Sequence, residues 1–471
     1  MALTTLVILF VSALLQAILP ASGEILHLDK KAIPAAYSLQ RLAAFTVYVS
    51  PDGPTVASGS SFVEIKGVQA HSTDPTKTDE TLAHYGSIQL SLISKNDYDQ
   101  HISKGPVCDV NDQMSNEGAS VAKYNVGFTT TEYMYSDIKK TSLYFLIVSN
   151  CGNFSQGELI GQVVVRNAFG FMSAIQYHKL TFYCYCMVLY MFLAVIWGYL
   201  CLTWRQELIV IHAVVGFVIG LKLVECVSWV GCLYNLNVSG EFSGIRTSLS
   251  IAITTMSSYS TYTWILVISQ GWGMTEQTLK NRTVVQIGVF GLIWACLNYV
   301  REGAMVSRQS FQIPSNIMTL TALGAMTTNG IYFVWVLMSL AQLSKKLEER
   351  NLEDQLKAVS SFTVAFIVAV VASVILAIVQ LLDCLDLLAV GWKHQYLADG
   401  GLAHVIFAST VVVAMRVWTP SADSGQMGYA APIGQNGEDA PCKEDWADED
   451  VEENGGNKIA PATVGAANDN L

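Results

Sequence analysis

Seven apolar stretches fill most of the chain between residues 179 and 418. A transmembrane helix needs about 20 mainly apolar residues to cross a bilayer, and each stretch reaches or approaches that length. We expect spans at 179–202, 208–233, 247–271, 284–301, 316–342, 358–382 and 401–418. Gln286, Asn298 and Arg301 dilute the fourth stretch, and six spans would place both ends of the chain on one side. The pattern predicts a seven-helix transmembrane domain over 179–418.

The composition agrees with burial in a bilayer. Of 471 residues, 52% are hydrophobic and 14% are charged, which is too apolar for an ordinary soluble domain. The net charge is −11, so no basic surface of the kind that binds nucleic acid is indicated, and we expect no nucleic-acid partner. Much of the acid excess lies in 421–471, where Gly, Pro, Asn and Ala are also frequent. This composition predicts a disordered acidic cytosolic tail.

An export signal is expected to precede the folded part of the chain. Residues 3–19 are apolar and are followed by Pro20, Ala21, Ser22 and Gly23, which suit signal peptidase, although a basic start is missing. We therefore expect a signal peptide over 1–23, with an uncleaved anchor or a buried helix as the alternative. The domain over 24–170 would then be lumenal.

Loop charges and glycosylation motifs orient the chain. A lumenal N-terminus puts more basic residues in the cytosolic loops than in the lumenal loops, as the positive-inside rule requires. The cytosolic loops would hold Arg205, Lys280, Arg282, Lys345, Lys346, Arg350 and Lys357. The lumenal loops would hold Arg246, Arg301, Arg308 and Lys393. The motifs Asn153-Phe-Ser and Asn237-Val-Ser both fall on the lumenal side, so we expect glycans on Asn153 and Asn237.

The segment 24–170 has the pattern of an antiparallel β-sandwich. Short runs rich in β-branched and aromatic residues recur between turn signals, and no long helical period intervenes. The runs are 43–49, 60–66, 87–93, 121–129, 142–149 and 159–166. Cys108 and Cys151 are the two cysteines of this segment, and we expect them to pair in an oxidising lumen. No nucleophile–base arrangement or metal-ligand spacing is legible, so we expect a binding module rather than an enzyme, without catalytic residues, metal or cofactor.

Several stretches carry a resemblance to a known family. They are YFLIVSNCGN at 144–153, NAFGFMSAIQYHKLTFYCYCMVLYMF at 167–192, GLKLVECVSWVGCLYN at 220–235, ISQGWGMTEQTL at 268–279 and MRVWTPSADSGQMGYA at 415–430. Together with the head, the seven spans and the acidic tail, they resemble the Golgi-dynamics-domain seven-transmembrane proteins, also called the lung seven-transmembrane receptor group. The exit of the last span is most similar to the transmembrane protein 87 branch.

The resemblance implies a Golgi-dynamics β-sandwich head and a location in the Golgi membrane, with endosomal or plasma-membrane locations as alternatives. It implies a role in endosome-to-trans-Golgi transport and Golgi organisation, through binding of lumenal cargo or lipid. A cation channel or transporter gated by pH or membrane state is the alternative function. A receptor that couples to G proteins is a further one.

Charged side chains in the second predicted span mark a candidate site. Lys222 and Glu225 lie three residues apart near its middle and therefore share one helix face. Charges at bilayer depth usually face a cavity or one another. The pair either lines a cavity for an ion or a lipid head group, in which a phospholipid would be bound, or forms a structural ion pair between packed helices.

Other polar groups of the spans are weaker candidates for such a cavity. Tyr259 and Tyr262 lie one turn apart in the hydroxyl-rich third span, where helix packing is the alternative role. Asp383 and Asp386, near the lumenal end of the sixth span, either form a pore mouth or end the span in solvent. We expect His212 and His404 to be interfacial.

The loop at 344–357 predicts an amphipathic helical hairpin, because leucines at 343, 347, 352 and 356 alternate with charged residues. It is either a docking surface for cytosolic trafficking adaptors or a solvated extension of two spans. The tail is a second candidate for adaptor binding. Membrane lipids and lumenal cargo complete the expected partners.

Overall fold

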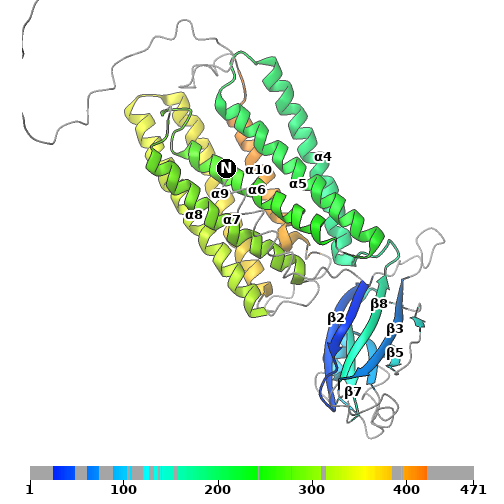
Figure 1. The fold of residues 1–471 in the computed structure, drawn as a ribbon. Coiled ribbons are helices and arrows are strands. Elements are labelled where there is room, and N and C mark those ends of the chain that lie inside the picture. Colours follow the sequence, from blue (N-terminus) through cyan, green and yellow to red (C-terminus); the bar gives the residue numbers. More distant parts are fainter. Residues whose placement is uncertain are drawn as a thin grey trace, which may run out of the picture. The chain divides into compact units, whose positions relative to one another are not determined.

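The computed structural model describes residues 25–47, 61–73, 88–102, 107–108, 120–126, 132–135, 138, 140–152, 157–241, 243–276, 278–308, 315–384, 394 and 396–421. In chain order, these residues form a set of β-strands and then seven long helices (Figure 1). The predicted signal peptide, Asn153, Asp386 and the tail from residue 422 lie outside the described residues.

The strands form two antiparallel sheets. In the described part of the head they are β1 (Ile25–Ala32), β2 (Ser38–Val47), β3 (Phe62–Ser72), β4 (Ile88–Ser94), β5 (Ser120–Val126), β6 (Glu132–Tyr135), β7 (Ser142–Asn150) and β8 (Gly157–Arg166). One sheet has the order β1-β8-β3-β6 and the other β2-β7-β4-β5. The predicted β-sandwich is therefore confirmed.

Strand β7 shows why the head has a continuous apolar run at 143–148. Tyr144, Leu146 and Val148 point into the core between the two sheets. Phe145 and Ile147 point the other way, into a smaller apolar cluster that also contains Cys151 and packs against Tyr98. Because side chains alternate between the faces of a strand, burial on both faces requires apolar residues at every position.

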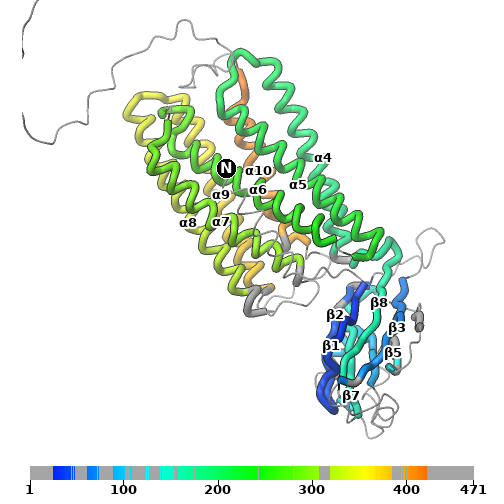
Figure 2. The backbone as a smooth tube through the Cα atoms, in the orientation of Figure 1, coloured from blue at the N-terminus to red at the C-terminus, as the bar shows by residue number. Residues whose placement is uncertain are grey.

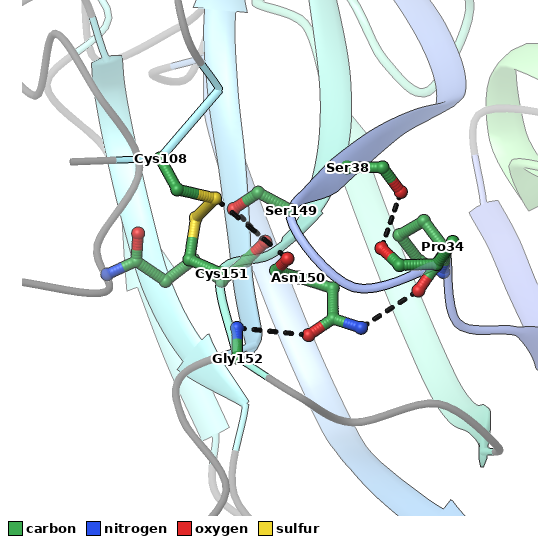
Figure 3. The surroundings of a disulfide bond; sticks show 9 residues. Pro34, Ser38, Cys108, Ser149, Asn150, Cys151 and Gly152 are labelled. Carbon is green, nitrogen blue, oxygen red and sulfur yellow. Dashed lines mark hydrogen bonds between the residues drawn. A yellow bond between two sulfur atoms is a disulfide. The ribbon is translucent and has the colours of Figure 1, made fainter. Parts of the chain in front are cut away.

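The disulfide joins this smaller cluster to a distant loop. Cys108 is bonded to Cys151, which directly follows β7, and their Cα atoms are 5.4 Å apart. Beside it, the Asn150 side chain donates to the carbonyl of Pro34 at 2.9 Å and accepts from the backbone N–H of Gly152 at 3.2 Å (Figure 3). The predicted cysteine pair thus fixes the end of β7.

The helices are α4 (Ala174–Thr203), α5 (Val210–Ser239), α6 (Gly244–Ser269), α7 (Asn281–Arg308), α8 (Ser315–Glu349), α9 (Glu353–Cys384) and α10 (Leu402–Val417). Each packs on its neighbour in sequence, and α10 also lies against α5 and α4, which closes the bundle (Figure 2). Helix α6 also contacts α8. We call the end of the bundle where α4 begins the proximal end and the opposite end the distal end.

Length and apolar composition make five helices of the described chain candidate membrane spans, namely α4, α5, α7, α8 and α9. Helix α10 is apolar but shorter, and α6 falls short because hydroxyl-bearing residues lower its hydropathy. Large apolar side chains on the outside of the bundle, such as Phe192, Val195 and Val368, are exposed as lipid-facing residues should be. The diluted fourth stretch is a complete helix of 28 residues.

The predicted hairpin exists, but its leucines face the bundle. Helix α8 continues to Glu349, and α9 begins at Glu353. Leu343 and Leu347 are buried, and Leu352 and Leu356 pack against the same apolar core. The apolar face of the hairpin is therefore covered by the protein itself, and its exposed face is charged.

Candidate functional site

A cavity of about 540 Å³ lies inside the bundle. All seven long helices contribute to its lining, which we call the central cavity. It reaches from Lys179 and Arg301 towards the proximal end to Phe362 and Trp418 towards the distal end. Its size is within the usual range of about 300–1,000 Å³ for small-molecule sites.

The centre of the site is an ion pair in α5. Lys222 Nζ donates to Glu225 Oε2 at 2.7 Å, and the two side chains are 8% and 1% exposed. Lys222 also lies 3.5 Å from Ser258 Oγ of α6 and 5.0 Å from the centre of the Phe407 ring of α10. The three-residue spacing on one helix brings the charges together, and the contacts with α6 and α10 hold the lysine between three helices.

His404 adds a third polar group to this pair. Its Nε2 lies 3.6 Å from Glu225 Oε1, and its imidazole packs edge-on against the Tyr183 ring at 5.3 Å. No hydrogen-bond partner for its buried Nδ1 is present among the described residues. The 3.6 Å separation is longer than a good hydrogen bond. His404 therefore offers the cavity an unused polar atom next to the ion pair.

Aromatic rings connect this centre to Lys179. Tyr183 of α4 stacks on Trp229 of α5 with ring centres 5.9 Å apart, and Lys179 Nζ lies 5.1 Å from the Trp229 ring centre. Trp229 Nε1 donates to Thr254 Oγ1 of α6 at 2.7 Å. Because Trp229 is tied to both neighbouring helices, it fixes the wall of the cavity between Lys179 and the ion pair.

Arg301 and Glu302 form a second charged group towards the proximal end. Arg301 Nη1 lies 3.2 Å from Glu302 Oε1, and its Nη2 donates to Gln380 Oε1 at 2.8 Å. Gln380 in turn donates to the carbonyl of Ala398 at 2.6 Å, which ties α9 to the segment before α10. This network places a cation and an anion at one end of the cavity.

The predicted site residues separate into two groups in the structure. Lys222, Glu225 and Tyr262 line the central cavity. Tyr259 is buried but packs towards Gly291 of α7 and is not part of the lining. Asp383 lies near the end of α9, also outside the lining, and its predicted partner Asp386 is outside the described residues.

Three charged residues of the site were not singled out as candidates from the sequence, and His404 was placed at the interface instead. Lys179, Arg301 and Glu302 lie near span ends, where charges are common, and only the packing of distant helices brings them to one cavity. His404 was expected to be interfacial, yet it is 8% exposed and contacts α5. His212 is also buried, at 2% exposed, where its Nδ1 accepts from the backbone N–H of Ile209 at the start of α5. A histidine inside an apolar run was the available signal for both.

The cavity is suited to an amphiphile. Its walls include many apolar and aromatic side chains, and its charged side chains lie around the ion pair of α5 and towards the proximal end. Among the described residues, no three His, Cys, Asp or Glu side chains come together as metal ligands would. A ligand with an apolar chain and a polar head can satisfy both kinds of surface at once.

These features define a class of membrane protein, in which an N-terminal β-sandwich precedes a seven-helix transmembrane bundle with an internal cavity. Comparison with known families agrees with this class. The family model described as "GOST, seven transmembrane domain" matches residues 178–425, which is more than half of the chain. The chain belongs to this family of seven-transmembrane proteins.

The related proteins share modest identity. The chain is 23% identical over 298 residues to transmembrane protein 87A of Xenopus tropicalis, and 22% identical over 295 residues to that of Homo sapiens. Each alignment covers 62% of this chain and 51% of the relative, so the chain spans about half the length of these relatives. Membrane protein PTM1 of Saccharomyces cerevisiae is 18% identical over 350 residues, covering 71% of this chain and 65% of that protein. The predicted resemblance to the transmembrane protein 87 branch is confirmed.

Proposed function

We propose that this protein acts in membrane trafficking in the Golgi and endosomes, and that its bundle binds a membrane phospholipid in the central cavity. The trafficking role rests on the resemblance to the Golgi-dynamics-domain group. Under this proposal the N-terminus is lumenal, the head binds lumenal cargo, and the protein is a binding protein rather than an enzyme.

The observation that carries the lipid-binding part is the combination of a large apolar cavity with buried charges. Lys222 and Glu225 are held together in its wall, and Lys179 and Arg301 lie nearer the proximal end. Buried charges are costly in a bilayer unless they face a partner or a cavity. A phospholipid head group offers both a negative phosphate and hydrogen-bonding atoms to these side chains.

Filling the cavity tests this proposal. Ala377 of α9 lines the cavity, and Ala372 of the same helix is half-buried outside the lining. The full chain purified in mild detergent should carry phospholipid that mass spectrometry detects. Ala377→Trp should lose most of it, because the indole occupies the ligand's space, whereas Ala372→Trp should retain it.

The cellular role has its own test. In cells that lack the protein, return of a recycling membrane cargo to the trans-Golgi network should slow, and the wild-type chain should restore it. Ala377→Trp should restore it poorly, and Ala372→Trp should restore it well. Unchanged cargo return in the null cells would reject the trafficking role while leaving lipid binding to the purified protein.

A cation channel or transporter is the second candidate, and the charged groups along the cavity favour it. Lys222 and Glu225 lie between Arg301 and Trp418 in the lining, so an ion path through the bundle would pass them. Liposomes containing the wild-type protein should then conduct cations, and Glu225→Gln should reduce the flux. Absence of flux at neutral and acidic pH would reject this candidate.

A further inference from the structure

Asn237 lies near the proximal end of α5 and holds a segment that precedes α4. Its side-chain Nδ2 donates to the carbonyl of Phe169 at 2.9 Å, and its Oδ1 accepts from the backbone N–H of Met172 at 3.3 Å. Its main-chain carbonyl accepts from the N–H of Phe171 at 3.1 Å. One residue of α5 thus makes three hydrogen bonds to three of the four consecutive residues from Phe169 to Met172.

The segment that Asn237 holds is also folded on itself. Asn167 and Gly170 exchange backbone hydrogen bonds of 2.8 and 3.1 Å, and the Asn167 side chain donates to the carbonyl of Met172 at 2.8 Å. Gly170 has a φ of 138°, which favours glycine, and a Cβ atom there would collide with the carboxamide of Asn237. The close approach of the segment to α5 therefore depends on the glycine.

We propose that Asn237 is a structural clasp between the 167–172 segment and α5, and that it carries no N-glycan although it begins an Asn-Val-Ser motif. Glycosylation acts on the amide nitrogen of an asparagine in a surface loop. Here the asparagine is in a helix, its side chain is half-buried, and the same nitrogen donates to Phe169. A sugar on Nδ2 would have to fit beside that carbonyl.

The clasp connects two parts of the chain that matter for the site. The 167–172 segment directly follows β8, which ends at Arg166, and α5 carries Lys222 and Glu225. Asn237 thus gives the segment after β8 a direct contact with the helix that bears the central ion pair. The clasp is a contact of the folded chain and does not depend on which ligand fills the cavity.

The first test maps glycans on the full-length wild-type protein made in cultured animal cells. Enzymatic release of N-glycans in ¹⁸O-water converts each glycosylated asparagine to labelled aspartate, which peptide mass spectrometry locates. Asn237 should remain an unlabelled asparagine. Labelled Asp at position 237 would overturn the proposal.

The second test measures hydrogen exchange at the two amides that Asn237 holds. Asn237→Ala should speed exchange at Met172 about fivefold, the factor that one hydrogen bond of ordinary net strength supplies. Exchange at Phe171 should change less, because its N–H bonds to the main-chain carbonyl of residue 237, which alanine keeps. Asn237→Asp keeps the acceptor for Met172 and should have a smaller effect. Ser239→Ala destroys the motif but leaves Asn237, so exchange at both amides should stay as in the wild type.

Two results of the exchange experiment would contradict the clasp. Wild-type exchange in Asn237→Ala would show that the contacts do not hold the segment. If amide exchange in Ser239→Ala is as fast as in Asn237→Ala, the faster exchange comes from a loosened helix end rather than from loss of the Asn237 carboxamide. If Asn237→Ala does not fold, the comparison of Asn237→Asp with Ser239→Ala decides in the same way.

Discussion

Lys222 and Glu225 form a buried ion pair one turn apart in α5, with 2.7 Å between Nζ and Oε2. His404 Nε2 of α10 lies 3.6 Å from the other carboxylate oxygen, Glu225 Oε1. The carboxylate of α5 therefore faces polar groups on two helices. Breaking a buried pair by removing one charge leaves the other uncompensated. The pair therefore links the stability of the bundle to the chemistry of the site.

Glu225→Gln should destabilise the protein by about 3–5 kcal/mol, because the ammonium of Lys222 remains buried without its anion. The double variant Lys222→Met with Glu225→Leu should recover most of that loss, since it removes both charges. Thermal unfolding in detergent measures each variant. If the double variant loses as much stability as Glu225→Gln, or more, the two charges do not stabilise each other.

Gly291→Ala should destabilise the bundle by about 1–3 kcal/mol, because a Cβ atom there meets the Tyr259 ring of α6. Gly288→Ala is the matched control, one turn earlier in α7, where a Cβ atom meets nothing within 4 Å. There alanine should be neutral or stabilising by up to about 1 kcal/mol, as expected for a helical glycine. If both variants unfold alike, Tyr259 does not pack on α7 as described.

Replacing Cys108 and Cys151 together by serine should lower the stability of the head by about 4 kcal/mol, the loop-entropy value for cysteines 43 residues apart. Calorimetry of the full chain, with and without a reductant, measures the change. The reductant should shift the wild type towards the double variant and leave the variant unaffected. A wild type insensitive to reductant under unfolding conditions would contradict the bond.

Leu347→Ala should cost about 2–5 kcal/mol, because Leu347 is fully buried between the hairpin and the bundle. Lys345→Ala, on the exposed face two residues earlier, should change stability by less than about 0.5 kcal/mol. Thermal unfolding of the two variants separates these cases. Unchanged stability in Leu347→Ala would mean that the apolar face of the hairpin is not buried against the bundle and is free for a partner.

The helices and most of the strands could be predicted from the residues within each segment. Apolar length predicted the seven helices, and short runs rich in β-branched and aromatic residues predicted six of the eight strands found in the described head. The runs missed β1, whose Asp29, Lys30 and Lys31 are exposed at the edge of a sheet, and β6, which has four residues. Edge strands bury little and so carry a weak apolar pattern.

The site was predictable only where its residues are neighbours in sequence. Lys222 and Glu225 share one helix face, so their spacing predicted the ion pair. His404 is 8% exposed and lies against Glu225 because α10 packs on α5, a contact between distant segments that no local pattern indicates. The same reason applies to Arg301 of α7 and Gln380 of α9, whose side chains meet although they are 79 residues apart in the sequence.

A photoactivatable phospholipid tests the central claim most directly. The full-length protein is labelled in liposomes that contain the probe, and mass spectrometry locates the attached residues. The account predicts label on residues of the cavity lining, such as Ser258 and Phe407, and its loss in Ala377→Trp but not in Ala372→Trp. Label confined to the outer, lipid-exposed face of the helices, unchanged by Ala377→Trp, would contradict a lipid inside the bundle.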